Sequence, residues 1–140
     1  MINNATGVFK MVSQRALKGK RILLVDDDAL IRHSLSMAFR NQGANVVAAE
    51  TAEEGLKFLD KEGVDMIISD YRLPGIDGLQ FFEKTNTICP EILKIMITAY
   101  GDSHIAREAF RIGVHDYVQK PFSPKALLGS MARLVGSRAL

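Results

Sequence analysis

The chain has 140 residues, of which 47% are hydrophobic and 24% are charged. These values are typical of one globular domain with its own hydrophobic core, and they exclude two domains of ordinary size. Residues 1–21 hold five basic residues and no acidic one, while the rest of the chain holds 13 basic and 16 acidic residues, so the net charge of +2 comes from the N-terminus.

Residues 1–18 show no clean periodicity, and we expect them to form a flexible basic extension before a domain over residues 19–138. We interpret this extension as a solvated leader, not as an arm that binds nucleic acid or a membrane. The single cysteine, Cys89, excludes an internal disulfide and a multi-cysteine metal site. Because no apolar run approaches the roughly 20 residues that span a bilayer, and no signal peptide is recognisable, we expect a cytoplasmic protein.

The first predicted strand is the aliphatic run Arg21–Val25, which ends in Asp26-Asp27-Asp28. A helix is predicted over residues 30–41 because apolar residues recur at helical spacing on one face, namely Ile31, Leu35, Ala38 and Phe39. Gly43 is expected to end this helix.

The second predicted strand covers residues 45–49, and Thr51-Ala52-Glu53-Glu54 then predicts a capping box with Thr51 as N-cap and Glu54 at the third helical position. Gly63 closes the helix that follows. The third predicted strand, residues 64–69, is almost continuously apolar, which is typical of a central parallel strand covered on both faces.

Asp70 follows the third strand directly and precedes a turn that contains Pro74-Gly75 and Asp77-Gly78. Three further predicted elements are a helix from Gly78 to about residue 87, a strand over residues 93–98, and a helix capped by Asp102 or Ser103. Ala106, Ala109, Phe110 and Gly113 are expected to lie along one side of that last helix.

The last predicted strand covers residues 114–119. Ser123-Pro124 then places a cap and a first-turn proline at the start of a helix that ends near Gly136. Its buried face is expected to hold Leu127, Leu128, Met131, Leu134 and Val135.

Five strands alternating with five helices predict a single α/β domain with a parallel sheet and helices on both faces. In such sheets the functional loops follow the carboxyl ends of the strands. Those loops hold Asp26-Asp27-Asp28, Asp70-Tyr71-Arg72, Thr98 and Lys120-Pro121.

Carboxylates gathered at one edge repel each other, so a cation is expected among them. Two candidates are Mg²⁺, which suits hard carboxylate oxygens, and Lys120. Together with the hydroxyl of Thr98, these groups predict a phosphoryl site in which Asp70 is the nucleophile. The absence of a P-loop and of a G-x-G-x-x-G motif argues against a tightly bound nucleotide.

These motifs resemble the receiver domain of two-component response regulators over about residues 19–137. The residues that carry the resemblance are Leu24-Val25-Asp26-Asp27-Asp28, Ser69-Asp70-Tyr71-Arg72-Leu73-Pro74-Gly75-Ile76-Asp77-Gly78, Ile97-Thr98-Ala99 and Lys120-Pro121-Phe122. The resemblance implies a flavodoxin-like, doubly wound, five-stranded parallel sheet of order 2-1-3-4-5 flanked by five helices.

By the same resemblance, Asp70 is the phosphorylated aspartate. Mg²⁺ would be held by Asp26, Asp27, Asp70 and the backbone carbonyl of Arg72, with Asp27 bound directly and Asp26 mostly through water. Asp28 lies outside this direct set.

Thr98 matches the switch hydroxyl of the family and Lys120 the lysine that binds the phosphoryl group. Tyr117 matches the switch aromatic residue. The resemblance also implies a cis peptide bond between Lys120 and Pro121.

The implied function is a phosphoacceptor signalling domain and not an enzyme. It would take its phosphoryl group from a sensor histidine kinase or a phosphotransfer protein. The surface of the last two helices and the strand between them would then control a partner protein or an output domain, and would also serve in a homodimer. Because only Ser137–Leu140 follow the last helix, we expect no DNA-binding unit and no direct contact with nucleic acid.

Two alternatives stay open. One is a Mg²⁺-dependent phosphatase with an aspartate nucleophile, which would favour a second aspartate two residues later, where this chain has Arg72. The other is a receiver-like interaction module that is never phosphorylated. Such modules lose the acidic pair, the acceptor aspartate or the lysine, and all of these are present here.

Overall fold

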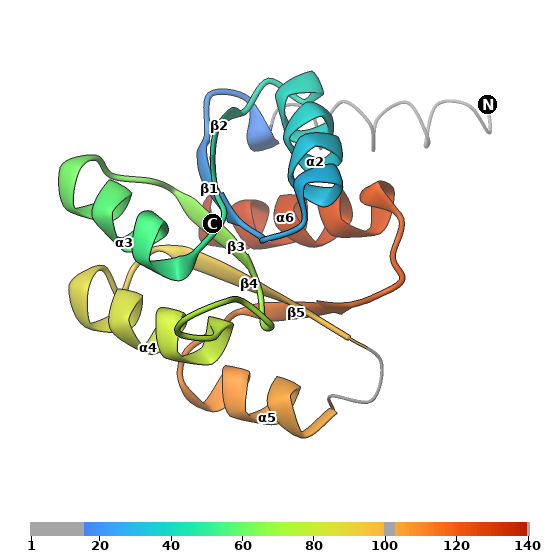
Figure 1. Cartoon of the computed structure of the whole chain (residues 1–140). Helices are drawn as coiled ribbons and strands as arrows, with labels where there is room; N and C mark the ends of the chain where they lie inside the picture. Colours follow the sequence, from blue (N-terminus) through green and yellow to red (C-terminus); the bar gives the residue numbers. More distant parts are fainter. Residues whose placement is uncertain (1–15, 100–102, 140) are drawn as a thin grey trace, which may run out of the picture.

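The computed structural model describes residues 16–99 and 103–139. Strands and helices alternate along this part of the chain (Figure 1). The strands are β1 (Arg21–Val25), β2 (Asn45–Ala49), β3 (Met66–Asp70), β4 (Leu93–Thr98) and β5 (Asp116–Gln119). The helices are α2 (Ala29–Asn41), α3 (Ala52–Lys61), α4 (Gly78–Ile88), α5 (Ser103–Arg111) and α6 (Pro124–Ala139).

The five strands form one sheet of order β2-β1-β3-β4-β5, and every neighbouring pair is parallel. The predicted fold and strand order are therefore confirmed. β1, β3 and β4 occupy the centre, and apart from Arg21 their residues are buried. Since the register pairs Val25 with Ser69 and Asp70 with Ile97, the carboxyl ends of these strands lie at one edge of the sheet.

Two hydrophobic clusters cover the two faces of the sheet. On one face α2 and α6 contribute Leu35, Phe39, Leu127 and Met131. On the other face α3, α4 and α5 contribute residues that include Leu59, Phe81, Phe82 and Ile105. Figure 1 shows this layered arrangement, with the sheet between the two groups of helices.

The ends of several elements differ from the sequence-based expectation. β3 begins two residues later and includes Asp70, β5 begins only at Asp116, and α6 continues to Ala139. Leu17, expected in the flexible extension, is 1% exposed and packs in the α2–α6 cluster. The packed domain therefore includes residues before the predicted boundary at residue 19, while residues 1–15 of the extension lie outside the described part.

The helix caps were predicted with mixed success. Thr51 accepts a hydrogen bond from the Glu54 N–H as expected, but the Glu54 carboxylate accepts from the N–H of Glu50 and not of Thr51, so the capping box is incomplete. A complete box stands instead at Asp77 and Gln80, where α4 begins. The Ser123 hydroxyl accepts from the Ala126 N–H at the start of α6.

Phe110, expected on the same side of α5 as Ala106 and Ala109, is 46% exposed, whereas Ile105, Ala106 and Ala109 form the buried face of this helix. Its ring packs edge-on against Tyr117 of β5 at a centroid distance of 5.7 Å. The proposed cap Asp102 lies outside the described residues, and Ser103 is the first residue of the helix. None of the described helices is both long and apolar enough to cross a bilayer.

Candidate functional site

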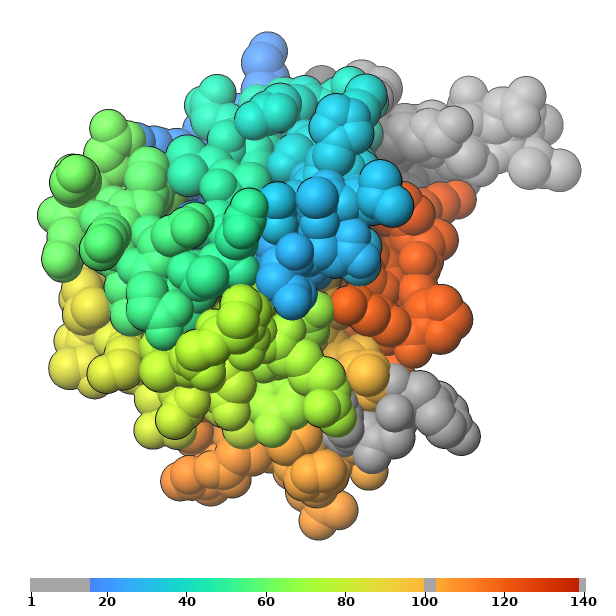
Figure 2. Space-filling view, viewed as in Figure 1, coloured from blue at the N-terminus to red at the C-terminus, as the bar shows by residue number. Residues whose placement is uncertain are grey.

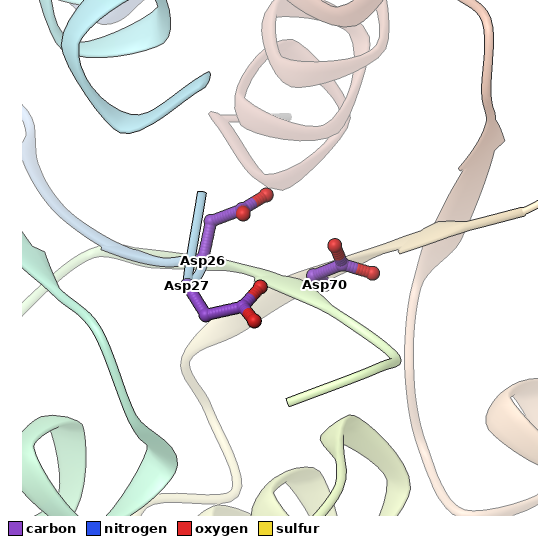
Figure 3. A group of neighbouring side chains, drawn as sticks. All are labelled: Asp26, Asp27 and Asp70. Carbon is purple, nitrogen blue, oxygen red and sulfur yellow. The ribbon is translucent and has the colours of Figure 1, made fainter. Parts of the chain in front are cut away.

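The site is built at the edge where β1 and β3 end. Asp26 and Asp27 follow β1 and Asp70 ends β3, and one carboxylate oxygen from each lies within 4.8 Å of the other two. Figure 3 shows these three carboxylates converging from the two strands. The sequence predicted this grouping, because parallel neighbouring strands bring their carboxyl ends to the same edge.

Asp26 is the buried member of the acidic pair, with an exposed fraction of 0%. Its Oδ1 accepts a hydrogen bond of 2.9 Å from the Asp28 N–H, whereas its Oδ2 is buried and has no hydrogen-bond partner among the described residues. Burial raises the pKa of Asp26 to about 6, against a lowering by the Asp28 N–H and with a further rise from the charge of Asp70. A buried carboxylate oxygen without a donor beside two other carboxylates fits a cation ligand.

Asp70 is held on both of its carboxylate oxygens. Oδ1 accepts from the Arg72 N–H at 3.2 Å, and Oδ2 accepts from the Lys120 ammonium at 2.8 Å. Only 8% of the Asp70 side chain is exposed, compared with 31% for Lys120. Burial alone would lower the pKa of Lys120, but the hydrogen bond and charge of Asp70 raise it above its ordinary value. Lys120 is therefore a positive partner of Asp70.

The backbone brings Lys120 to this position. Its N–H donates to the Thr98 carbonyl at 2.7 Å, which joins the end of β5 to the end of β4. The Lys120–Pro121 peptide bond is cis, as predicted. Thr98 is 1% exposed at the end of β4, next to the strand that carries Asp70. Of the two predicted partners of Asp70, Thr98 thus ends β4 and Lys120 directly follows β5, the strands that continue the sheet beyond β3.

The turn after Asp70 packs tightly against the site. Gly78 donates its N–H to the Tyr71 carbonyl at 2.8 Å, and a Cβ at position 78 would lie 2.5 Å from the Asp70 carbonyl oxygen. This close approach explains the glycine at the start of α4. The Arg72 guanidinium lies 5.9 Å from the centroid of the Tyr71 ring.

Tyr117, the predicted switch residue, lies on β5 beside Met96 of β4. It is 37% exposed, and its ring contacts the ring of Phe110 on α5. Because Met96 also pairs with Ser69, Tyr117 lies level with the end of β3 and is separated from Asp70 across the sheet by β4. Its ring lies on the α5 side of the sheet, beside Phe110.

Two side chains near the site were missed at the sequence level. Arg32 donates to the backbone carbonyl of Asp26 at 2.8 Å, and the Glu53 carboxylate accepts from the Ile76 N–H at 3.1 Å. Arg32 lies four residues after Asp28, one helical turn into α2, and this spacing was the available signal. Glu53 contacts a residue 23 positions away, and no local pattern indicates that.

An apolar groove of about 680 Å³ borders the site between α2 and the connection from β5 to α6. It is lined by Leu30, Ile31, Ser34, Leu35, Lys120, Pro121, Phe122 and Pro124. Figure 2 shows the start of α2, the loop after β3 and the start of α6 on one face of the molecule. The Lys120 side of the site therefore opens toward an apolar surface.

Comparison with known proteins gives consistent matches. The family model for the response regulator receiver domain matches residues 22–132. The response regulator protein FleR of Pseudomonas aeruginosa is 40% identical over 113 residues, which are 81% of this chain and 24% of FleR. The phosphate regulon transcriptional regulatory protein PhoB of Klebsiella pneumoniae is 35% identical over 111 residues, 78% of this chain and 48% of PhoB.

Among solved structures, a CheY-like response regulator receiver domain protein of Methanospirillum hungatei JF-1 has a TM-score of 0.83 and 31% identity. The match covers 87% of this chain and 98% of that one. The chain spans 24% of FleR and 48% of PhoB.

Proposed function

This chain belongs to the family of response regulator receiver domains, the signalling domains of two-component systems, and we propose that Asp70 is its phosphoacceptor. The observation that carries this proposal is the position of Asp70 between the acidic pair and Lys120. One of its oxygens lies within 4.8 Å of oxygens from Asp26 and Asp27, and Oδ2 bonds to Lys120 at 2.8 Å.

In the proposed reaction an oxygen of the Asp70 carboxylate attacks the phosphorus of a phosphohistidine on a sensor histidine kinase or a phosphotransfer protein. A P–O bond forms as the P–N bond breaks, and the electron pair of the broken bond stays on the histidine ring. The product is an acyl phosphate on Asp70. Water later attacks this phosphorus, releases inorganic phosphate and restores the carboxylate.

The acidic group fits Mg²⁺, because its donors are hard carboxylate oxygens and one of them, Oδ2 of Asp26, is buried without a hydrogen bond. Asp26, Asp27, Asp70 and the backbone carbonyl of Arg72 would hold the ion. When bound, Mg²⁺ offsets the negative charge of the phosphoryl oxygens and of the carboxylates around them.

Lys120 has a separate task in this proposal. Its ammonium already neutralises Asp70, and it would shift its hydrogen bond to a phosphoryl oxygen once the acyl phosphate forms. The Thr98 hydroxyl would donate to a second phosphoryl oxygen. This rearrangement would turn Tyr117 inward and break its contact with Phe110, which changes the surface of α5, β5 and α6.

That surface would control either a partner protein or an output domain of a longer protein, and it would also serve in homodimers. Several relatives, such as PhoB, are named transcriptional regulators and are longer than this chain. We propose that this domain supplies the switch and that any contact with nucleic acid is made by other parts of such proteins.

Turnover separates the proposed function from the phosphatase alternative. The protein is incubated with Mg²⁺ and either acetyl phosphate or p-nitrophenyl phosphate in large excess. A receiver would hold at most one phosphoryl group per chain and would leave p-nitrophenyl phosphate intact. Sustained release of p-nitrophenol that is lost in Asp70→Asn would instead establish the phosphatase.

The switch is tested by amide NMR spectra of the protein with and without beryllium fluoride, which mimics the acyl phosphate. We expect shifts to spread from the site to Tyr117 and Phe110. In Thr98→Ala the shifts should stay close to Asp70. Equal spreading in both proteins would contradict the role of Thr98.

A further inference from the structure

The β2–α3 connection, taken as residues 49–53 from the end of β2 to the first turn of α3, contacts both loops that carry the proposed Mg²⁺ ligands. Ala49 ends β2, and its carbonyl accepts from the Asp26 N–H at 3.1 Å. The Asp26 carbonyl accepts from Nη1 of Arg32 at 2.8 Å, and Nη2 of the same guanidinium lies 3.3 Å from the Glu50 carboxylate. The backbone of Asp26 is thus tied to this connection through both its N–H and its carbonyl.

The connection itself is fixed locally. The Glu50 N–H donates to the Glu54 carboxylate, and the Thr51 hydroxyl caps α3. The Arg32 side chain is 17% exposed and that of Glu50 64%, so the bond from Arg32 to the Asp26 carbonyl competes less with water than its contact with Glu50 does. The guanidinium therefore joins the part-buried carbonyl of Asp26 to the start of the β2–α3 connection.

The other side of the same connection holds the loop after β3. The Glu53 carboxylate accepts from the Ile76 N–H at 3.1 Å. Gly75 has φ +76° and lies so close that a Cβ would stand 2.7 Å from the Glu53 carboxylate. This loop includes Arg72, whose carbonyl is a proposed ligand.

We propose that Arg32 and Glu53 are positioning residues that fix the two ligand loops relative to each other through the β2–α3 connection. The inference rests on the proposed Mg²⁺ site and goes beyond it. Three carboxylates with oxygens within 4.8 Å of one another repel, and this repulsion tends to spread the loops in the absence of a cation. Arg32 resists the spreading by holding the backbone of Asp26.

Whether Mg²⁺ affinity falls or rises when Arg32 is removed distinguishes a positioning role from a purely electrostatic one. If Arg32 acted only as a nearby positive charge, its removal would strengthen Mg²⁺ binding, because one repulsive charge would be lost. If Arg32 holds the ligand loop, its removal weakens binding. Loss of an outer-shell partner typically lowers metal affinity by about tenfold or more, and we expect a loss of that size in Arg32→Ala.

The experiment is an NMR titration of the unphosphorylated protein with Mg²⁺, without a phosphodonor. Arg32→Ala and Glu53→Ala should both bind Mg²⁺ more weakly than the wild type. Arg32→Lys should recover part of the affinity, because its ammonium can still donate to the Asp26 carbonyl but lacks the two-sided reach of the guanidinium. Arg40→Ala is the matched control. Arg40 also lies on α2 and donates to a backbone carbonyl, that of Val46, away from the carboxylates.

Unchanged or tighter Mg²⁺ binding in Arg32→Ala would overturn the proposal, and equal losses in Arg40→Ala would overturn it as well. Dispersed amide spectra confirm folding in each variant, and Arg32→Lys provides the comparison if the alanine variant does not fold. Asp27→Asn separates the two levels of the argument. If Asp27→Asn leaves Mg²⁺ binding unchanged, the proposed metal site fails, whereas a loss in Asp27→Asn alone refutes only the positioning role.

Discussion

Replacing Asp26 with asparagine should stabilise the metal-free protein. The Asp26 carboxylate is fully buried, and burial raises its pKa from 3.8 to about 6 in the folded chain. A rise of about two pKa units, at about 1.4 kcal/mol per unit, means that the charged form lowers the free energy of unfolding by about 3 kcal/mol. Asparagine keeps the oxygen that accepts from the Asp28 N–H and removes the charge.

The predicted pH dependence has a definite sign. Between pH 3.8 and about pH 6 the folded protein binds more protons at Asp26 than the unfolded chain does. The destabilisation is therefore absent at lower pH, grows through this window and is complete above it. The advantage of Asp26→Asn should be about 3 kcal/mol near pH 8 and about half of that near pH 5.

The free energy of unfolding is measured by urea unfolding in the presence of a metal chelator, at pH values across the window described above. Asp60→Asn is the control, because Asp60 is an exposed carboxylate on α3. Addition of millimolar Mg²⁺ should stabilise the wild type more than Asp26→Asn, since a ligand stabilises only the state that binds it. If Asp26→Asn is no more stable than the wild type near pH 8 without metal, the buried charge of Asp26 does not destabilise the folded protein and the reasoning is wrong.

Three substitutions test other parts of the structure. Thr51→Ala should lower the free energy of unfolding by about 1 kcal/mol through loss of the α3 cap, measured by urea unfolding. Gly78→Ala should lower the free energy of unfolding by about 2 kcal/mol and slow phosphorylation by acetyl phosphate, because the new Cβ would clash with the Asp70 carbonyl oxygen. Gly63→Ala is the control, because a Cβ there meets no atom, and it should change neither quantity. Lys94→Ala should lower the free energy of unfolding by about 3 kcal/mol. The substitution removes the fully buried methylene groups of Lys94 and the ammonium that donates to the Ile92 carbonyl at 2.7 Å. Lys94→Met, which keeps the volume, should cost less, and equal losses would show that packing is unimportant at this position.

The sequence was sufficient for the features that depend on strand ends. Asp26, Asp70 and Thr98 each follow or end an apolar run, and Lys120 follows the last predicted strand. A parallel sheet brings such positions to one edge. The strand order came from the resemblance to receiver domains, since alternation of strands and helices alone is compatible with other orders.

The features that were missed depend on contacts between distant segments. Helical spacing placed Phe110 on the same side of α5 as Ala106 and Ala109, but only the two alanines are buried there, and the Phe110 ring contacts Tyr117 instead. Glu54 was assigned to the Thr51 N–H, yet the turn geometry presents the N–H of Glu50. A sequence pattern gives the spacing of residues along one element and does not determine which neighbouring group a side chain reaches.

The central claim, phosphorylation of Asp70, is tested most directly by the intact mass of the protein after incubation with acetyl phosphate and Mg²⁺. The wild type should gain the mass of one phosphoryl group and lose it again on standing. Asp70→Asn, which keeps the shape of the side chain but lacks the carboxylate, should gain none. Addition of one phosphoryl group to Asp70→Asn at the wild-type rate would contradict the account.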